Sequence, residues 1–278
     1  VGVLSLRELL GADENAILKD IMAPTTLKLS YDLDQEKAAK IFQDSDLVTL
    51  PVIDTNGRMI GVLHVDEMMD VLQQEATEDI HKMASISVDE DEEVKGLLES
   101  SMGWLYKKRI GWLVILVFVN LLSGAGIASY EELLNQHIYV VFFLPLLIAS
   151  GGNTGSQSTT LVIRAMAVGD VTMRDWGKVF AKDALLSFAL GITMAAAIAV
   201  IGYYRGSDYG AGTETAIIIA LSMVIVVMFG GLLGAIIPFV FRLFKLDPAT
   251  ASTPLITSIC DIAGVFIYLG IASLFLQL

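Results

Sequence analysis

Two patterns of hydrophobic and polar residues divide this chain. In the first third, short apolar runs alternate with polar turns, a pattern that predicts strands and short helices. Farther along, five long apolar runs follow one another, each about as long as a helix that crosses a bilayer. They cover roughly residues 108–128, 138–163, 179–204, 213–241 and 251–277. We therefore expect an α-helical polytopic membrane protein with five transmembrane helices, preceded by a cytosolic α+β domain.

The predicted α+β domain contains an internal repeat. Residues 2–10 are echoed by residues 61–69, and in both places a strand ends in a polar turn that opens a helix. Between the two copies, the alternation and the turn residues predict further elements. These are a strand near residues 27–29, a helix at about 34–44, and strands at 48–53 and 59–64 around a turn at Asp54–Gly57.

Charge is divided as unevenly as hydrophobicity. Residues 1–101 carry a net charge of −14, whereas residues 102–278 carry +1, together the −13 of the chain. A domain this acidic repels the phosphates of nucleic acids and anionic lipids. We therefore expect its small-molecule partner to be a cation. We expect no nucleic acid partner.

Several carboxylates lie on the stretch between the two parts, where we expect a helix over residues 70–101. Glu75, Glu78 and Asp79 are spaced to share one helical face, with Asp70 a turn or more before them. Carboxylates that close repel each other unless a divalent cation lies between them. The run of five acidic residues at 89–93 is instead typical of a solvated helix face.

The second apolar run is interrupted by a polar decad at residues 151–160, which holds three glycines, Asn153, Gln157 and several hydroxyl residues. Small residues in a membrane helix often serve close packing, and this is one interpretation of the glycines. Polar groups in lipid must also face protein or a water-filled cavity. For the decad as a whole we therefore favour the wall of a pore.

One carboxylate, that of Asp261, is predicted near the middle of a span. It lies about ten residues into the fifth span, or roughly 15 Å deep, with no Lys or Arg at comparable depth. It is either a protonated acid in helix packing or a carboxylate that faces water and a permeating cation, and we favour the second. Thr257, one turn earlier, would add oxygen ligands on the same side. Two such chains at a twofold axis would give two carboxylates to one ion, so we expect a homodimer.

The flanks of the spans predict the orientation. Nine basic residues lie on alternate flanks, among them 107–109, Arg164 and Arg242, whereas the opposite flanks hold only Arg205. The positive-inside rule then places the N-terminal domain in the cytosol and the C-terminus outside, in a cell (inner) membrane. Pro145, Pro238 and Pro254 fall within spans, where we expect them to bend or break helices.

These motifs together resemble the MgtE family of magnesium channels. The resemblance rests on 151–158 after Pro145, on 247–249 and Pro254, and on 261–264, with a CBS-like repeat before them. It implies three parts: a CBS region at 1–72, an acidic connecting or plug helix at 73–103, and a five-helix pore domain at 104–278. Family members usually carry a further N-terminal helical domain and a complete CBS pair, so we expect an N-terminal portion beyond this sequence.

The resemblance also implies roles for particular residues. It implies a Mg²⁺-selective channel whose pore lies at the axis of a homodimer in the bilayer, and which closes at high cytosolic Mg²⁺. The pore residues fall on Asp261, Asn153 and Thr257. The cytosolic metal-sensing residues fall on Asp70, Glu75, Glu78, Asp79, Asp247, Asp34, Glu36, Asp46 and Glu67.

Other readings of the sequence remain open. CBS pairs often bind adenosine nucleotides through a hydroxyl and a carboxylate, which Ser5 and Glu8 match in part while His64 replaces the hydroxyl in the second copy. ATP is thus a possible cofactor beside Mg²⁺, and a nucleotide-sensing membrane protein is one alternative. Another is a channel for Co²⁺ or Mn²⁺, although Cys260 stands alone as a soft ligand. We do not expect an enzyme, because no second acid, His or nucleophile lies at the depth of Asp261.

Overall fold

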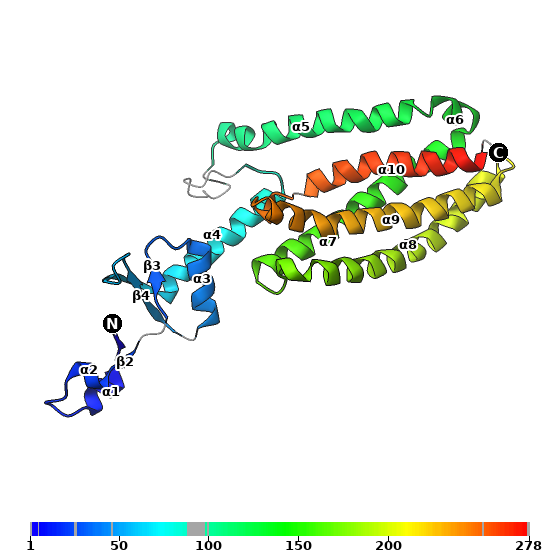
Figure 1. Ribbon diagram of the computed structural model, residues 1–278. Helices are drawn as coiled ribbons and strands as arrows, with labels where there is room; N and C mark the ends of the chain where they lie inside the picture. The colour runs from blue at the N-terminus through cyan, green and yellow to red at the C-terminus, as the bar shows by residue number, and fades with distance from the viewer. Residues whose placement is uncertain are drawn as a thin grey trace. The chain divides into compact units, whose positions relative to one another are not determined.

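The chain forms two compact units, Val1–Glu78 and Asp79–Leu278, in the computed structural model (Figure 1). The structure describes residues 2–4, 6–24, 27–45, 47–87, 98, 100–251 and 253–276. Asp46 and the acidic run at 89–93 lie outside the described residues, so the predictions made for them stay predictions.

The first unit is built on a three-stranded sheet of order β3-β4-β5. Strands β3 (Leu29–Ser30) and β4 (Thr49–Ile53) are parallel, and the helix α3 (Gln35–Asp44) connects them. Strand β5 (Met59–His64) returns antiparallel to β4. The turn between β4 and β5 is fixed by Asp54, whose Oδ1 accepts hydrogen bonds from the backbone N–H groups of Asn56 and Arg58, each at 2.8 Å. The predicted helix at 34–44 and the two later strands are confirmed, whereas β3 begins only at residue 29.

A small core holds this sheet to its helices. Phe42 and Ala39 of α3 are buried against Leu29 and Leu50 of the sheet and against Met68 of α4 (Val65–Met83). Short elements precede the sheet: β1 (Gly2–Val3) pairs antiparallel with β2 (Ala23–Pro24), and α1 (Leu6–Gly11) and α2 (Leu18–Ile21) lie between them. The order strand then helix at β1 and α1 recurs at β5 and α4, as the sequence repeat predicts.

Helix α4 ends at Met83, so the prediction of a helix that continues through residue 101 is wrong for residues 84–87, and residues 88–97 lie outside the described part of the chain. The N–H of Ile86 bonds the carbonyl of His81 and the N–H of Ser85 bonds that of Lys82, both at 2.9 Å. This pair of bonds closes the helix, and it requires the residue at Ser85 to adopt a left-handed conformation, with φ of 59°. Glycine is the usual residue at such a position. A serine there gives no sign of the turn in the sequence.

The second unit contains five helices long and apolar enough to cross a membrane, which confirms the five predicted spans. They are α5 (Met102–Ala128), η1 with α7 (Ile138–Phe143 and Leu144–Ala167), η2 with α8 (Met173–Asp175 and Trp176–Ser207), α9 (Gly212–Leu243) and α10 (Thr253–Leu276). The short α6 (Glu131–Gln136) and η3 (Pro248–Thr250) connect them.

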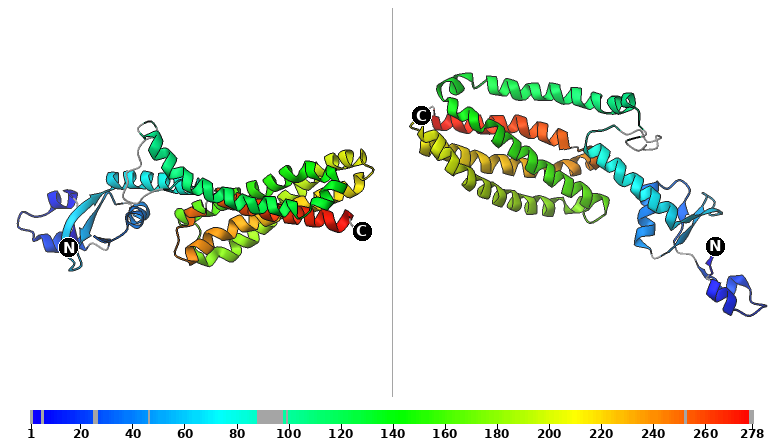
Figure 2. Two further views of the ribbon diagram at one scale, coloured as in Figure 1. Left: turned by 90° about the horizontal axis from the view of Figure 1, so that it is seen from above. Right: turned by 180° about the vertical axis from the view of Figure 1, so that it is seen from behind.

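Helix α9 is the centre of this unit and packs against α8, α7 and α10, as the views of Figures 1 and 2 agree. Helix α5 lies at the edge and packs mainly against α10. Where the spans end, the Tyr268 hydroxyl on α10 donates a buried hydrogen bond of 2.8 Å to the carbonyl of Val140. A buried hydroxyl needs such a partner, and this bond ties α10 to the start of the second span.

The prolines do not interrupt the spans as expected. Pro145 lies in the first turn of α7 and Pro254 in that of α10, where the missing N–H has no helical partner to lose. Pro238 does lie inside α9, but the helix continues through it to Leu243. In the first two cases proline favours the start of a helix, so the prediction of a bend or break there is wrong.

Candidate functional site

The polar decad at 151–160 lies wholly within the helix α7 and is divided between two faces. Gly151, Gly155 and Ser158 are buried, together with Gly152, Thr154 and Thr159. Asn153 and Gln157 are exposed in the single chain, and so is Thr160. Because residues four and three apart follow one another on one side of a helix, the exposed residues form a polar stripe.

The buried face of α7 is a close contact with α9. A Cβ added at Gly230 would lie 2.1 Å from the carbonyl oxygen of Gly151, and one at Gly234 would lie 2.1 Å from that of Gly155. The Thr159 hydroxyl donates a hydrogen bond of 3.0 Å to the carbonyl of Gly234. Small residues that let two backbones touch are typical of membrane helix packing, so the glycines serve this contact.

The same helix touches α10 next to Asn153. A Cβ at Gly152 would lie 3.2 Å from the Thr257 methyl group, and one at Gly155 would lie 3.3 Å from the sulfur of Cys260. Asn153 and Asp261 each follow one of these contact residues in the chain. The fold therefore brings the two pore segments predicted from the sequence to one helix crossing.

Asp261 is half-buried beside this crossing and lacks a partner. Within the described residues, its carboxylate accepts no hydrogen bond and forms no ion pair, and the amides of Asn153 and Gln157 make no side-chain hydrogen bond either. Thr257, one turn before, donates its hydroxyl to the carbonyl of Pro254 at 3.0 Å, which leaves the lone pairs of its oxygen free to accept. Hydrocarbon solvates none of these groups, so they require water, an ion or a second protein surface.

A second intramembrane carboxylate, that of Asp183 on α8, has a different environment. The Ser158 hydroxyl on α7 lies 2.9 and 3.0 Å from its two oxygens, and the Ser187 hydroxyl on α8 lies 3.3 Å from one of them. Gly231 of α9 makes room, because a Cβ there would lie 1.9 Å from the Ser187 oxygen. Asp183 was not among the site residues predicted from the sequence. The signal was the spacing of Asp183 and Ser187 by four residues in an apolar run.

In the first unit, several of the predicted sensor carboxylates bond to the protein itself. Asp34 caps α3 by accepting from the N–H of Lys37 at 3.4 Å. Glu67 accepts from the N–H of His64 at 3.1 Å at the start of α4, as the third residue of a helix does in a capping box. Glu75 accepts from the Gln35 amide at 2.6 Å. Glu36 and Asp70 are exposed.

In the second unit, Asp247 has both carboxylate oxygens engaged. Oδ2 forms an ion pair of 2.6 Å with Lys82 in the last turn of α4, and Oδ1 accepts from the N–H of Ala249 at 2.9 Å. Glu78 and Asp79 lie on α4, are the last residue of the first unit and the first of the second, and are partly buried. Among the residues that the structure describes, no three His, Cys, Asp or Glu side chains come together closely enough to hold a metal ion. The described sensor residues thus form no such cluster in this structure, and their role in metal sensing stays a prediction.

Comparison with known proteins adds two domain matches. Residues 144–271 match the MgtE family, described as a divalent cation transporter, and residues 18–74 match the CBS domain. The chain is 38% identical to the magnesium transporter MgtE of Thermus thermophilus, in an alignment 278 residues long that covers 99% of this chain. It is 30% and 29% identical to the proteins of that name from Bacillus subtilis and Enterococcus faecalis. The chain spans 59% of the length of each of these curated relatives.

Proposed function

Because this chain is a multi-pass membrane protein of the MgtE family, with a CBS domain before its membrane helices, we propose that it conducts Mg²⁺ into the cell. The observation that carries the proposal is the unpartnered carboxylate of Asp261 beside the polar stripe of α7. An enzyme would need a second reacting group there, and transport needs only a wet path with a charge of the right sign.

The ligands present suit a hydrated ion. Mg²⁺ prefers oxygen ligands and gives up its waters reluctantly, so it is bound in proteins through few carboxylates and several water-mediated contacts. Asp261 supplies the charge, and the Asn153 amide and the Thr257 oxygen supply neutral groups that bond to the water shell. Asp261 would thus select cations, and Asn153 and Thr257 would hold the hydrated ion.

A homodimer completes this path. One Asp261 per chain is a weak anionic site, and the polar stripe of α7 is exposed in the single chain. A second copy related by a twofold axis would place two such stripes and two carboxylates around one passage. It would also remove the stripes from lipid, so the pore and the dimer interface form together.

Cytosolic Mg²⁺ closes this channel in our proposal. The CBS region and α4 carry the excess negative charge, with Asp34, Glu36, Asp46, Glu67, Asp70, Glu75, Glu78, Asp79 and Asp247 as the sensor carboxylates. Their mutual repulsion favours an open arrangement, and bound Mg²⁺ screens it. For this feedback to work, the ion must bind the closed state more tightly than the open one. The basic flanks of the spans support a cytosolic position for this region and a C-terminus outside.

Mg²⁺ uptake into liposomes tests the proposal. Vesicles with the full-length protein and a trapped Mg²⁺ indicator should take up the ion faster than protein-free vesicles, and Asp261→Asn should remove most of the difference. Uptake by Asp261→Asn at the wild-type rate would refute the pore assignment. The same assay with Co²⁺ and Mn²⁺ outside decides between a Mg²⁺ channel and one for other divalent ions, and ATP titration of the protein decides whether the CBS region also binds nucleotide.

A further inference from the structure

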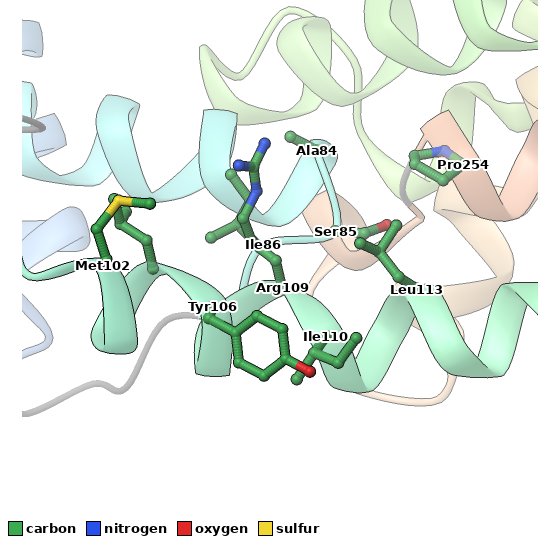
Figure 3. A pocket seen from close by; sticks show the side chains of 10 residues that line it. Ala84, Ser85, Ile86, Met102, Tyr106, Arg109, Ile110, Leu113 and Pro254 are labelled. Atoms are coloured by element: carbon green, nitrogen blue, oxygen red, sulfur yellow. The ribbon is translucent and has the colours of Figure 1, made fainter.

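The first three turns of α5 line a cleft that belongs to neither the ion path nor the sensor set. Met102, Tyr106, Arg109 and Leu113 follow one another at spacings of three and four residues, and Ile110 lies four residues after Tyr106, so they share one face of the helix. The turn at 84–86 forms the opposite wall, and Pro254 at the start of α10 lines it too (Figure 3). The cleft has a volume of about 430 Å³ and mostly apolar walls.

Among the described residues that line the cleft, Arg109 is the only charged one. Figure 3 shows its side chain rising from α5 toward the turn that carries Ala84. Within the described chain, its guanidinium forms no ion pair and no hydrogen bond. Lys107 and Lys108 precede it, and Lys108 lies 5.3 Å from the centre of the Trp104 ring. Aromatic and basic residues at the start of a span mark the depth of lipid headgroups.

We propose that this cleft binds one anionic phospholipid, with the phosphate on the guanidinium of Arg109 and an acyl chain along the apolar stripe of α5. Guanidinium matches the planar, two-pronged hydrogen bonding of a phosphate group. Beyond Arg109, Ile110 and Leu113 continue the apolar side of α5 toward the middle of the span, which is the direction in which an acyl chain would run. The proposal does not depend on which ion the protein conducts.

The position of α5 makes a lipid the occupant. Only 11% of the most apolar stretch of this helix is buried in the chain, so most of its surface is left uncovered by this chain, and in a bilayer lipids are available to cover it. A lipid in the cleft would touch the turn after α4, the start of α5 and the start of α10 at once. It would thereby brace the connection between α4 and the membrane helices against thermal unfolding.

Labelling of a cysteine in the cleft tests this proposal. In a Leu113→Cys variant of the full-length protein, the new thiol is at an exposed position, and Cys260 of this chain is buried. In neutral detergent, added phosphatidylglycerol should slow maleimide labelling of this thiol at least fivefold, and phosphatidylcholine with the same acyl chains should not. Equal protection by both lipids, or no protection by either, would overturn the proposal. So would full protection before any lipid is added, because a protein segment would then fill the cleft.

A matched pair of charge variants locates the headgroup. Combined with Leu113→Cys, Arg109→Gln should raise the phosphatidylglycerol concentration for half-protection roughly fivefold. Lys107→Gln removes the same charge two residues away, at a position that does not line the cleft, and should change that concentration much less. Equal shifts in the two variants would mean that the lipid responds to surface charge alone, and this would contradict a site at Arg109.

Discussion

The two sides of α7 treat polar groups in opposite ways. Toward α8 and α9, Ser158 bonds to Asp183, Thr159 bonds to a backbone carbonyl, and the glycines bring backbones into contact. On its exposed stripe and beside α10, Asn153, Gln157 and Asp261 have no partner in the described chain. We interpret the difference as one between packing and transport: Ser158 and Thr159 hold helices together, and the three groups without a partner are the ones that we propose meet the ion.

The largest effect on stability is expected where backbones touch. Gly230→Ala should destabilise the membrane domain by about 3 kcal/mol, because the new Cβ would collide with the carbonyl oxygen of Gly151 and force α7 and α9 apart. Thermal unfolding in detergent measures this. Gly124→Ala on α5 is the matched control, since a Cβ there meets nothing within 4 Å. Equal stability of the two variants would show that the helix contact is not as close as described.

A smaller effect is expected at the half-buried carboxylate of Asp183. Asp183→Leu should cost about 1 kcal/mol of stability, because the hydroxyls of Ser158 and Ser187 lose their shared acceptor. Asp183→Asn keeps an acceptor oxygen and should be close to wild type. If both variants unfold at the wild-type temperature, the hydrogen bonds of Asp183 do not stabilise the contact between α7 and α8.

The exposed stripe should behave in the opposite way. Gln157→Leu should change stability by less than about 0.5 kcal/mol, because the side chain has no partner in the chain to lose. It should nevertheless slow Mg²⁺ uptake several-fold if the stripe lines the ion path. A strongly destabilised variant would instead place Gln157 in packing.

The smallest shift is expected at a carboxylate that is already paired. Lys82 now occupies Oδ2 of Asp247, so Mg²⁺ must displace it to use that oxygen. Lys82→Gln should therefore let internal Mg²⁺ bind the closed state better and halve uptake at about threefold lower concentration. Uptake into vesicles loaded with graded internal Mg²⁺ gives this value. A shift to higher concentration would mean that the ion pair itself stabilises the closed state.

The sequence predicts the membrane domain well because hydrophobic length alone determines a span. It also predicts α3, β4 and β5, whose turns and alternation are local signals. The end of α4 could not be predicted, because the residue with the left-handed conformation after the helix is Ser85 and not a glycine. The sequence also could not predict which residues of the decad at 151–160 are buried. Polar residues occur all round α7, so which of them are buried depends on α9 and α10, which lie far away in the chain.

The partners of the sensor carboxylates also could not be predicted from the sequence. Spacing predicts which of them share a helix face, but not that Glu67 caps α4 or that Asp247 pairs with Lys82. Those partners are fixed by the fold. Their roles in metal sensing stay predictions.

The two intramembrane aspartates give the most direct test of our central claim, that Asp261 alone of the two meets the permeating ion. Asp261→Asn and Asp183→Asn are the same change in the same domain, so Mg²⁺ uptake by the two variants in matched proteoliposomes compares only their positions. We predict that Asp261→Asn loses most uptake, at least tenfold, while Asp183→Asn stays within about twofold of wild type. Equal uptake by the two variants, or a greater loss from Asp183→Asn, would contradict the account.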